Sequence, residues 1–372
     1  MSLPQTTREY SFPSFGSYKN LVVNEKPVDA PKPHEVLVKV HAVSLNYRDN
    51  VMASGFYAKS GVKIPDNLIP CSDMAGEIIA LGKGVKGWQI GDRVCANFAT
   101  DHIYGDTNPD IQSSSMGGQA HGTLTQYRTF PSHSLVKFPD FWSYKEASTL
   151  PCAALTAYNA LNGPRRIKAG DYVLILGTGG VSIFGLQFAI ASGAIVIATS
   201  SSDEKLKIVS GLGAQHVINY KKTLEWDQEV LRIVSTTVNL YDWTISAGPL
   251  VLPRFQTNGV GVDHVLEVGG DGTLSRSINS VRMAGYVHVI GAVSKGPGDT
   301  NIVWRTIRKG ILLRGIQIGS VEQFRDMVRL IIANPEKTKP VIDKVFSFDE
   351  AVDAFAHFES QQHVGKIVIK VA

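Results

Sequence analysis

The chain has 372 residues, 44% of them hydrophobic and 19% charged, which is typical of a globular protein with more than one domain. Its formal net charge is +4 and no block of like charges occurs, so the electrostatic signature of nucleic-acid binding is absent. The amino terminus lacks a charged lead followed by an apolar run, so we expect a cytoplasmic protein.

The first part of the chain, to about residue 150, contains short segments with the composition of β-strands. Clusters of Pro, Gly, Asn and Asp separate them, and this spacing favours an all-β unit with irregular loops. The expected strands are 35–45, 73–82, 92–98, 123–130 and 134–138.

From about residue 151 the pattern changes to apolar strands that alternate with helical stretches such as 204–213 and 273–285. Such alternation predicts an α/β fold with a doubly wound parallel sheet. A capped helix and a final strand close the chain, and these could return to the first domain. The expected strands are 171–180, 193–202, 214–220, 262–270, 285–294 and 310–320.

One segment, 172–202, contains no charged residue and is long enough to span a bilayer. Its composition fits another structure better, because two strand-length β-branched runs flank a glycine cluster and a helical stretch. Two strands and a helix buried in a parallel sheet have this composition. We therefore expect no membrane span.

A glycine-rich turn follows the first of these strands. Gly177, Gly179 and Gly180, followed by Val181, lie between a buried strand and a helix, where bare backbone can approach a pyrophosphate at the helix amino end. Ser182 replaces the third glycine of the dinucleotide fingerprint. A tight turn without a ligand is the alternative.

The end of the next strand bears on which dinucleotide is bound. Enzymes that use NAD usually carry an acid there for the ribose hydroxyls. Here the strand ends in Ser200 and Ser201, and Lys205 follows, which favours a 2′-phosphate and therefore NADP(H) over NAD(H). Asp203 and Glu204 argue the other way, unless they only complement the dipole of the next helix.

Several short strings now form an ordered set: "AVSLNYRD", "PCSDMAGEI", "GDRV", "LPCAALTAYNAL", "GTGGVS", "GAQHVINY", "VLEVGG" and "GKIVIKV". As a set they resemble the medium-chain dehydrogenase/reductase superfamily, and within it the zinc-independent alcohol-dehydrogenase-like and quinone-oxidoreductase-like members. The resemblance implies a GroES-like β domain, 1–150 and 335–372, and a Rossmann domain, 151–334, with the active site in a cleft. The strand at 311–320 resembles the family's subunit-pairing strand, which suggests a homodimer.

The resemblance also implies where a metal would be. Zinc members hold a catalytic ion with a Cys, a His and a Cys beside a Glu, whereas this chain has Asn46, Ser72, Cys152 and Asp73 at the matching positions. One thiolate is too few for a tetrahedral zinc that needs three protein ligands, so we expect no metal. The four closely spaced cysteines of the structural zinc lobe are also missing. A polar loop replaces them, and its His102 and His121 are expected to face solvent.

Other positions are assigned by the resemblance alone. Thr156 would pack near the nicotinamide, Tyr220 would lie near the adenosine phosphate, and Gly269 and Gly291 would close around the nicotinamide ribose. Each has an alternative role as a core or turn residue.

Without a metal, hydrogen-bond donors must stabilise the negative charge that hydride transfer places on an acceptor oxygen. Asn46, Tyr47 and Arg48 form a cluster of such donors, with Tyr47 the first choice and Arg48 the second, and Asp49 is expected to be a structural acceptor. A polar loop without a catalytic role is the alternative.

These observations predict a zinc-independent NADPH-dependent oxidoreductase that acts on a small molecule. Activated alkenes and quinones are favoured over simple carbonyls, because they delocalise the charge. Three alternatives remain: a non-catalytic dinucleotide-binding protein, an NAD-dependent enzyme similar to alcohol dehydrogenase, and a methyltransferase with a glycine-rich loop.

The segment 234–256 is longer than the connection that the resemblance leads us to expect. Removing it leaves a normal connection. The residues at its ends are compatible with an intron left in the gene sequence, and a genuine surface insertion is the alternative, since long loops are tolerated thermodynamically.

Overall fold

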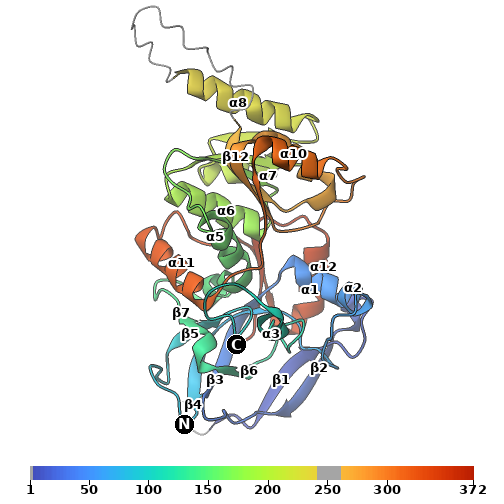
Figure 1. Ribbon diagram of the computed structural model, residues 1–372. Coiled ribbons are helices and arrows are strands. Elements are labelled where there is room, and N and C mark those ends of the chain that lie inside the picture. The colour runs from blue at the N-terminus through green and yellow to red at the C-terminus, as the bar shows by residue number, and fades with distance from the viewer. Residues whose placement is uncertain (1–2, 241–260) are drawn as a thin grey trace, which may run out of the picture. The chain divides into compact units, whose positions relative to one another are not determined.

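The computed structural model describes residues 3–240 and 261–372, which form two compact units (Figure 1). The first unit contains the residues up to 158 together with 179–181 and 318–372. The second contains 159–178 and 182–317. The chain is therefore an α/β protein, as expected, and its first unit contains residues from both ends of the sequence.

The first unit is built on a seven-stranded sheet in the order β14-β15-β3-β4-β5-β7, with β6 also paired to β3, and on a separate hairpin-like pair of β1 and β2. A core rich in phenylalanine and valine fills it. Its strands are β1 Thr6–Ser11, β2 Val22–Pro27, β3 Glu35–Ser44, β4 Asp73–Leu81, β5 Arg93–Ala96, β6 Tyr127–Pro131, β7 Leu135–Lys137, β14 Ile342–Ser347 and β15 Lys366–Lys370. Its helices are α1 Tyr47–Ala53, α2 Phe56–Lys59, α3 Pro109–Ser113, α4 Tyr144–Ala147, α11 Val321–Ala333 and α12 Ala351–Glu359.

The pairing of β15 with β3 is the contact that matters most for the site. The two strands are antiparallel, with Val368 opposite Ser44 and Lys370 opposite Ala42. The last strand of the chain thus lies beside the end of β3, directly before the segment that carries the predicted donors. On its other side β3 pairs with β4, where Ser44 is opposite Asp73.

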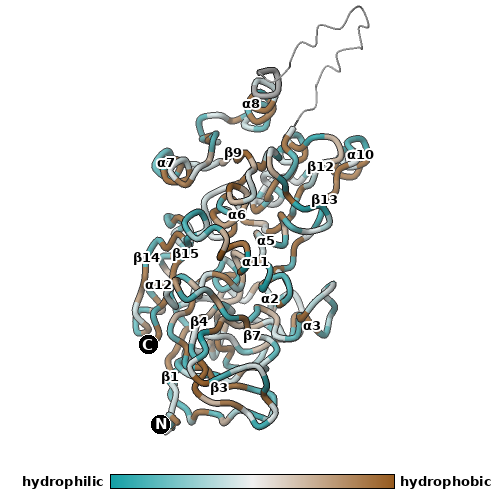
Figure 2. Tube along the Cα trace, turned by 90° about the vertical axis from the view of Figure 1, so that its left-hand side faces the viewer, coloured by the Kyte–Doolittle hydropathy of each residue, from teal (hydrophilic) through white to brown (hydrophobic). Residues whose placement is uncertain are grey.

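The second unit is a six-stranded parallel sheet in the order β10-β9-β8-β11-β12-β13, which is the Rossmann arrangement. Figure 2 shows hydrophobic residues along β9, whose central residues are buried. The strands are β8 Tyr172–Leu176, β9 Ile195–Ser200, β10 His216–Asn219, β11 Val262–Glu267, β12 Val281–Val289 and β13 Leu312–Gly315. The helices are α5 Leu155–Leu161, which spans the boundary, α6 Gly180–Ala191, α7 Asp203–Gly211, α8 Trp226–Leu240, α9 Leu274–Ser280 and α10 Ile302–Lys309.

The uncharged segment 172–202 folds as β8, α6 and β9, which confirms the two strands and helix predicted for it. Among the residues that the structure describes, no helix is both long enough and apolar enough to cross a membrane.

Two boundaries differ from expectation. The helix predicted over 273–285 ends at Ser280, because Val281 already pairs with Val262 and begins β12. The expected domain limits after Leu150 and before Pro335 also move. Helix α11 belongs to the first unit, where the Val321 N–H donates to the His102 carbonyl at 2.8 Å.

The unusual segment 234–256 is described only in part. Helix α8 continues through its first residues, and Val234 is fully buried in the core of the second unit. The rest of the segment, from residue 241, lies outside the described residues.

Candidate functional site

The four predicted donor and acceptor residues lie together at the start of α1, immediately after β3. Asn46 is the residue before the helix, with extended backbone, and its N–H donates to Asp49 Oδ2 at 2.7 Å. A side chain that closes back on the start of a helix in this way stabilises the first turn. The segment is therefore an ordered helix start and not the loop that sequence reasoning allowed.

The two donors preferred from the sequence are placed differently from each other. The Tyr47 residue is 44% exposed. The Arg48 guanidinium donates to the Met116 carbonyl and lies 4.2 Å from the centre of the Phe98 ring. A cation held by a carbonyl and an aromatic face contributes to packing. These contacts favour a structural role for Arg48 and leave Asn46 as the buried donor.

Asp49 is almost completely buried, at 1% exposure, and its Oδ1 has no hydrogen-bond partner in the described structure. Burial disfavours the charged carboxylate and raises its pKa from 3.8 to about 6, although the Arg48 guanidinium and the Asn46 N–H oppose this. Asp49 is therefore the acceptor that the sequence predicted, with a carboxyl that is partly protonated near neutral pH.

Asp73 connects the positions that match the metal ligands of zinc members. Its carboxylate accepts from the Ser72 hydroxyl at 2.6 Å and from the Cys152 N–H at 3.3 Å. The Ser44 hydroxyl lies 3.4 Å from the same group. Residues that are 79 positions apart in the sequence thus meet around one buried carboxylate.

Lys366 is the residue that sequence reasoning missed. It begins β15 and is only 2% exposed. Its ammonium donates to the Leu45 carbonyl and to Asn46 Oδ1, each at 2.6 Å, and lies 3.7 Å from Asp73 Oδ2. A lysine at the head of the apolar run "KIVIK" was the available signal, because a charge in a buried strand needs partners.

The side chains around Asp73 do not fit a zinc ion. Asn46 and Ser72 are poor ligands for it, and the Lys366 ammonium already supplies a positive charge there. The remaining thiol is that of Cys152, and one thiolate is too few for a zinc ion that needs three protein ligands. Within residues 3–240 and 261–372 no group of three His, Cys, Asp or Glu side chains could hold a metal.

One histidine of the polar loop corrects the sequence prediction. His102 is buried, at 6% exposure, and its Nε2 lies 2.9 Å from the Gly105 carbonyl. Its carbonyl also accepts the first N–H of α11, so the loop is hydrogen-bonded to that helix. His121 is exposed, as predicted.

The glycine turn between β8 and α6 has the features of a phosphate-binding loop. Gly177 has φ +73°, which favours glycine, and nothing lies within 4 Å of a Cβ built on Gly179. The open space at Gly179 is where a dinucleotide phosphate would fit. Gly180 has a different role, because a Cβ there would come 2.6 Å from Lys366 Cδ. Val181 continues the helix, and the Ser182 hydroxyl donates to the Leu176 carbonyl at 2.7 Å.

The acids after β9 already have partners. Asp203 accepts from Asn219 at 2.6 Å and from the Lys222 ammonium, and these two hydrogen bonds lower its pKa. Glu204 accepts from the Ser202 hydroxyl at 2.6 Å. Both carboxylates therefore have hydrogen-bond partners within the protein.

The hydroxyls and the cation predicted for this edge of the sheet are present. Ser200 is buried at the end of β9, and Ser201 is half-buried after it. Lys205 lies in the first turn of α7, where its N–H is 3.4 Å from the Ser202 hydroxyl. Tyr220 donates its N–H to the Ser200 carbonyl at 3.0 Å, and 40% of the residue is exposed.

Two further glycines follow β11 and β12. The Gly269 N–H donates to the buried carboxylate of Glu267 at 2.7 Å, and a Cβ on Gly291 would approach the Val268 carbonyl to 2.7 Å. Because the strands are parallel, Gly177, Ser200, Gly269 and Gly291 lie at one edge of the sheet. This is the edge where dinucleotides bind in such folds. Thr156, predicted near the nicotinamide, lies buried in α5 in the first unit.

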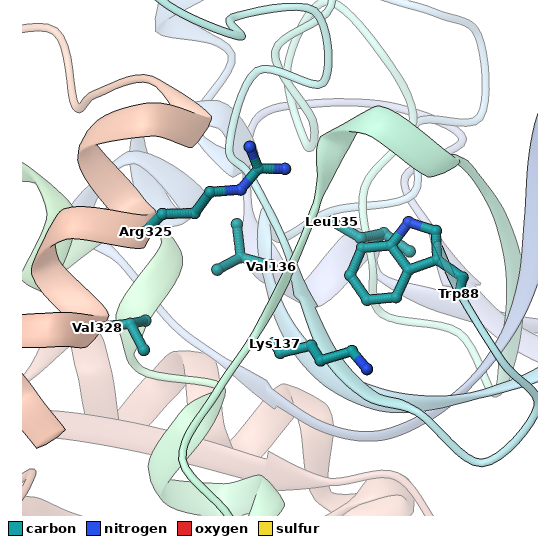
Figure 3. Close-up of a pocket in the computed structure, with 6 residues that line it drawn as sticks. All are labelled: Trp88, Leu135, Val136, Lys137, Arg325 and Val328. Atoms are coloured by element: carbon teal, nitrogen blue, oxygen red, sulfur yellow. The ribbon is translucent and has the colours of Figure 1, made fainter. Parts of the chain in front are cut away.

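A surface hollow of about 290 Å³ in the first unit is lined by Trp88, by Leu135, Val136 and Lys137 of β7, and by Arg325 and Val328 of α11 (Figure 3). None of the predicted site residues lines it. It therefore supports no assignment of the active site.

The comparisons with known proteins agree with this geometry. Residues 32–140 match the alcohol dehydrogenase GroES-like domain family, and residues 180–333 match the zinc-binding dehydrogenase family. A zinc-type alcohol dehydrogenase-like protein of Schizosaccharomyces pombe is 43% identical over 344 residues, which are 91% of each chain. The chain belongs to the medium-chain dehydrogenase/reductase superfamily. It is an NAD(P)-dependent oxidoreductase, and the methyltransferase alternative is thereby excluded.

Relatives with lower sequence identity are named after activities other than alcohol dehydrogenase. The quinone oxidoreductase of Rattus norvegicus is 28% identical over 92% of this chain and 91% of its own, and the crotonyl-CoA reductase of Streptomyces avermitilis is 28% identical over 94% and 81%. Among solved structures, a candidate alcohol dehydrogenase from Sinorhizobium meliloti 1021 has a TM-score of 0.86 and 33% identity, with both chains covered completely.

We predict that Asp49→Asn changes how stability depends on pH. The folded protein holds the Asp49 proton up to about pH 6, whereas the unfolded chain releases it near 3.8. The stabilising contribution of this proton is complete below the lower value and is lost as the pH rises through about 6. The variant should therefore gain about 1 kcal/mol relative to the natural protein between about pH 5 and about pH 8.

Urea unfolding across this range measures the effect. Asp353→Asn is the matched control, because Asp353 is an exposed acid in the first turn of α12. A difference between Asp49→Asn and the natural protein that stays constant with pH would contradict the assigned protonation.

Proposed function

We propose that this oxidoreductase is zinc-independent, uses NADPH, and reduces an activated alkene, a quinone or a carbonyl compound. The observation that carries the proposal is the buried Lys366 ammonium, bonded to Asn46 and 3.7 Å from Asp73, among the positions that hold the metal in zinc members. A fixed ammonium supplies the positive charge that an ion would supply.

The electrostatics support the absence of zinc. A divalent cation beside the Lys366 ammonium would meet repulsion in a low-dielectric environment, which the nearby Asp73 and Asp49 carboxyls would oppose. The word zinc occurs in the name of the S. pombe relative and in the description of the matching family. These words refer to those proteins and not to this chain.

The second unit supports a bound NADPH. Gly177 and Gly179 would hold the pyrophosphate at the start of α6, and Ser200, Ser201 and Lys205 would hold the 2′-phosphate. The neighbouring acids accept hydrogen bonds from Asn219, Lys222 and Ser202, which supports a role for them at the start of α7. When bound, NADPH supplies a hydride.

In the first unit, donors at the start of α1 would stabilise the oxygen of the acceptor. Hydride addition to a carbon of the acceptor moves an electron pair onto that oxygen, and a proton from solvent completes the reduction. Enones and quinones spread this charge over a conjugated system and need less stabilisation than simple ketones. The names of two relatives, quinone oxidoreductase and crotonyl-CoA reductase, describe acceptors of this activated kind.

The function is tested by following NADPH oxidation with a panel of enones, quinones and simple ketones, after elemental analysis of the purified protein. We expect turnover with at least one enone or quinone, zinc well below one ion per chain, and activity that survives treatment with a chelator. Stoichiometric zinc that is needed for activity, or turnover with simple ketones alone, would contradict the proposal.

The cofactor preference has its own test. We predict that Ser201→Asp raises KM for NADPH at least tenfold, roughly 1.4 kcal/mol, because a carboxylate repels the 2′-phosphate. In the same variant, KM for NADH should be unchanged or lower. The control is Ser210→Asp, the same change at an exposed position of α7. Equal effects of Ser201→Asp on both cofactors would show that the 2′-phosphate does not lie near this serine.

We also infer a homodimer in the cytoplasm. Strand β13 is the edge strand of the second unit's sheet, and the adjoining α10 exposes Val303 at 71%, Trp304 at 64% and Ile307 at 67%. An open strand edge beside exposed apolar side chains is a surface suited to a second copy. Cys71, Cys95 and Cys152 are all free thiols, which fits a reducing compartment.

We predict that Trp304→Glu combined with Ile307→Glu converts the dimer to a monomer in analytical ultracentrifugation, because two charges would be buried in the interface. The control is Ile208→Glu, at an apolar position that is 45% exposed on α7. A natural protein that sediments as a monomer, or a variant that stays dimeric, would contradict the assigned surface.

A further inference from the structure

The side-chain amide of Asn46 is half satisfied. The residue is 9% exposed, its Oδ1 accepts a hydrogen bond of 2.6 Å from Lys366, and its Nδ2 is buried with no partner among the described residues. Buried donors almost always have a partner, so one that has none needs an explanation. A ligand oxygen that binds to this amide would provide the missing acceptor.

The orientation of the amide follows from the chemistry of its neighbour. A lysine ammonium has three donors and no acceptor, so the amide atom that faces it must be Oδ1. The two protons of Nδ2 therefore point away from Lys366. The main chain of Asn46 is also fixed, because its N–H donates to Asp49 Oδ2 at 2.7 Å.

The Lys366 side chain is held both at its ammonium and along its alkyl chain. Its ammonium bonds the Leu45 carbonyl as well as Asn46, and Asp73 lies 3.7 Å away. Its alkyl chain fills the space that a Cβ on Gly180 would occupy, since Lys366 Cδ would lie 2.6 Å from that atom. The cation therefore has little freedom to turn away from Asn46 Oδ1.

We propose that Asn46 Nδ2 donates the hydrogen bond that stabilises the oxygen of the hydride acceptor, and that Lys366 is a positioning residue that orients this amide. The ammonium on Oδ1 also polarises the amide and strengthens its N–H groups as donors. This inference rests on the proposed function, and it selects Asn46 from the cluster because its Nδ2 is the buried donor left without a partner among the described residues.

The kinetic test is a double-mutant cycle. Asn46→Ala should lower kcat by about 100-fold to 1,000-fold, the effect of removing one donor to a developing oxyanion, with KM for NADPH little changed. Lys366→Met should lower kcat by at least tenfold in the natural background. In the Asn46→Ala background it should have almost no further effect, because it acts through the amide.

Two more variants complete the cycle. Lys366→Arg keeps a donor cation and should retain most of the activity. Lys370→Met makes the same kind of change at the exposed end of β15 and should leave kcat unchanged. Losses that multiply in the double variant would show that Lys366 acts on something other than Asn46, and a kcat of Asn46→Ala within threefold of the natural value would overturn the assignment of the donor.

A binding measurement separates this inference from the proposed function. The probe is 4-nitrophenolate, an oxyanion on a conjugated ring, titrated into the protein loaded with NADP⁺ and followed by its visible absorbance. Asn46→Ala and Lys366→Met should each weaken its affinity at least tenfold, whereas Lys366→Arg should stay within threefold. Unchanged affinity in Asn46→Ala would overturn the inference.

Failure of the proposed function and failure of the role assigned to Asn46 give different experimental results. A natural protein that turns over no enone, quinone or carbonyl compound contradicts the proposed function, and the phenolate titration still decides the role of Asn46. Circular dichroism and thermal unfolding show which variants fold. If Lys366→Met does not fold, Lys366→Gln, which keeps a neutral N–H donor, takes its place in both measurements and should show an intermediate loss.

Discussion

The buried ammonium of Lys366 is the interaction on which the proposed site depends. A charge in a protein interior is costly unless partners compensate it, and the compensation here comes from the Leu45 carbonyl, Asn46 Oδ1 and the Asp73 carboxylate. These groups belong to the ends of β3 and β4, whereas Lys366 belongs to the last strand. The antiparallel pairing of β15 with β3 is therefore a condition for a stable charge at this place.

The same cation bears on how the proposed site would work without a metal ion. In a metal enzyme a Lewis acid meets the negative charge that forms on the substrate oxygen. Here a fixed ammonium lies behind an asparagine amide, so the charge would be met by N–H groups that the protein has already oriented. Such preorganised donors cost no reorganisation during the reaction. The Asp73 carboxylate accepts hydrogen bonds from the Ser72 hydroxyl and from the main chain of Cys152.

Much of the fold was predictable because local signals were strong. Parallel strands that are buried on both faces are apolar runs, and β8, α6 and β9 were found in this way from the segment 172–202. Predictions failed where a tertiary partner overrode the local pattern. The apolar residues after Ser280 have a helical spacing, but Val281 pairs with Val262 and becomes a strand. Helix α11 lies within the sequence range that was expected for the nucleotide-binding domain. Its first N–H groups nevertheless donate to carbonyls of the loop at His102 in the first unit.

By itself the sequence determined the family and the glycine turn, because each of these depends on residue types at short spacing. Gly177, for example, needs its left-handed φ wherever the rest of the chain lies. Only the tertiary structure decided that Arg48 is bonded to Met116, that Lys366 is bonded to Asn46 Oδ1, and that Asn46 Nδ2 is buried without a partner among the described residues. Lys366 and Asn46 are 320 positions apart, and a hydrogen bond over that separation follows from strand pairing, which no local pattern encodes.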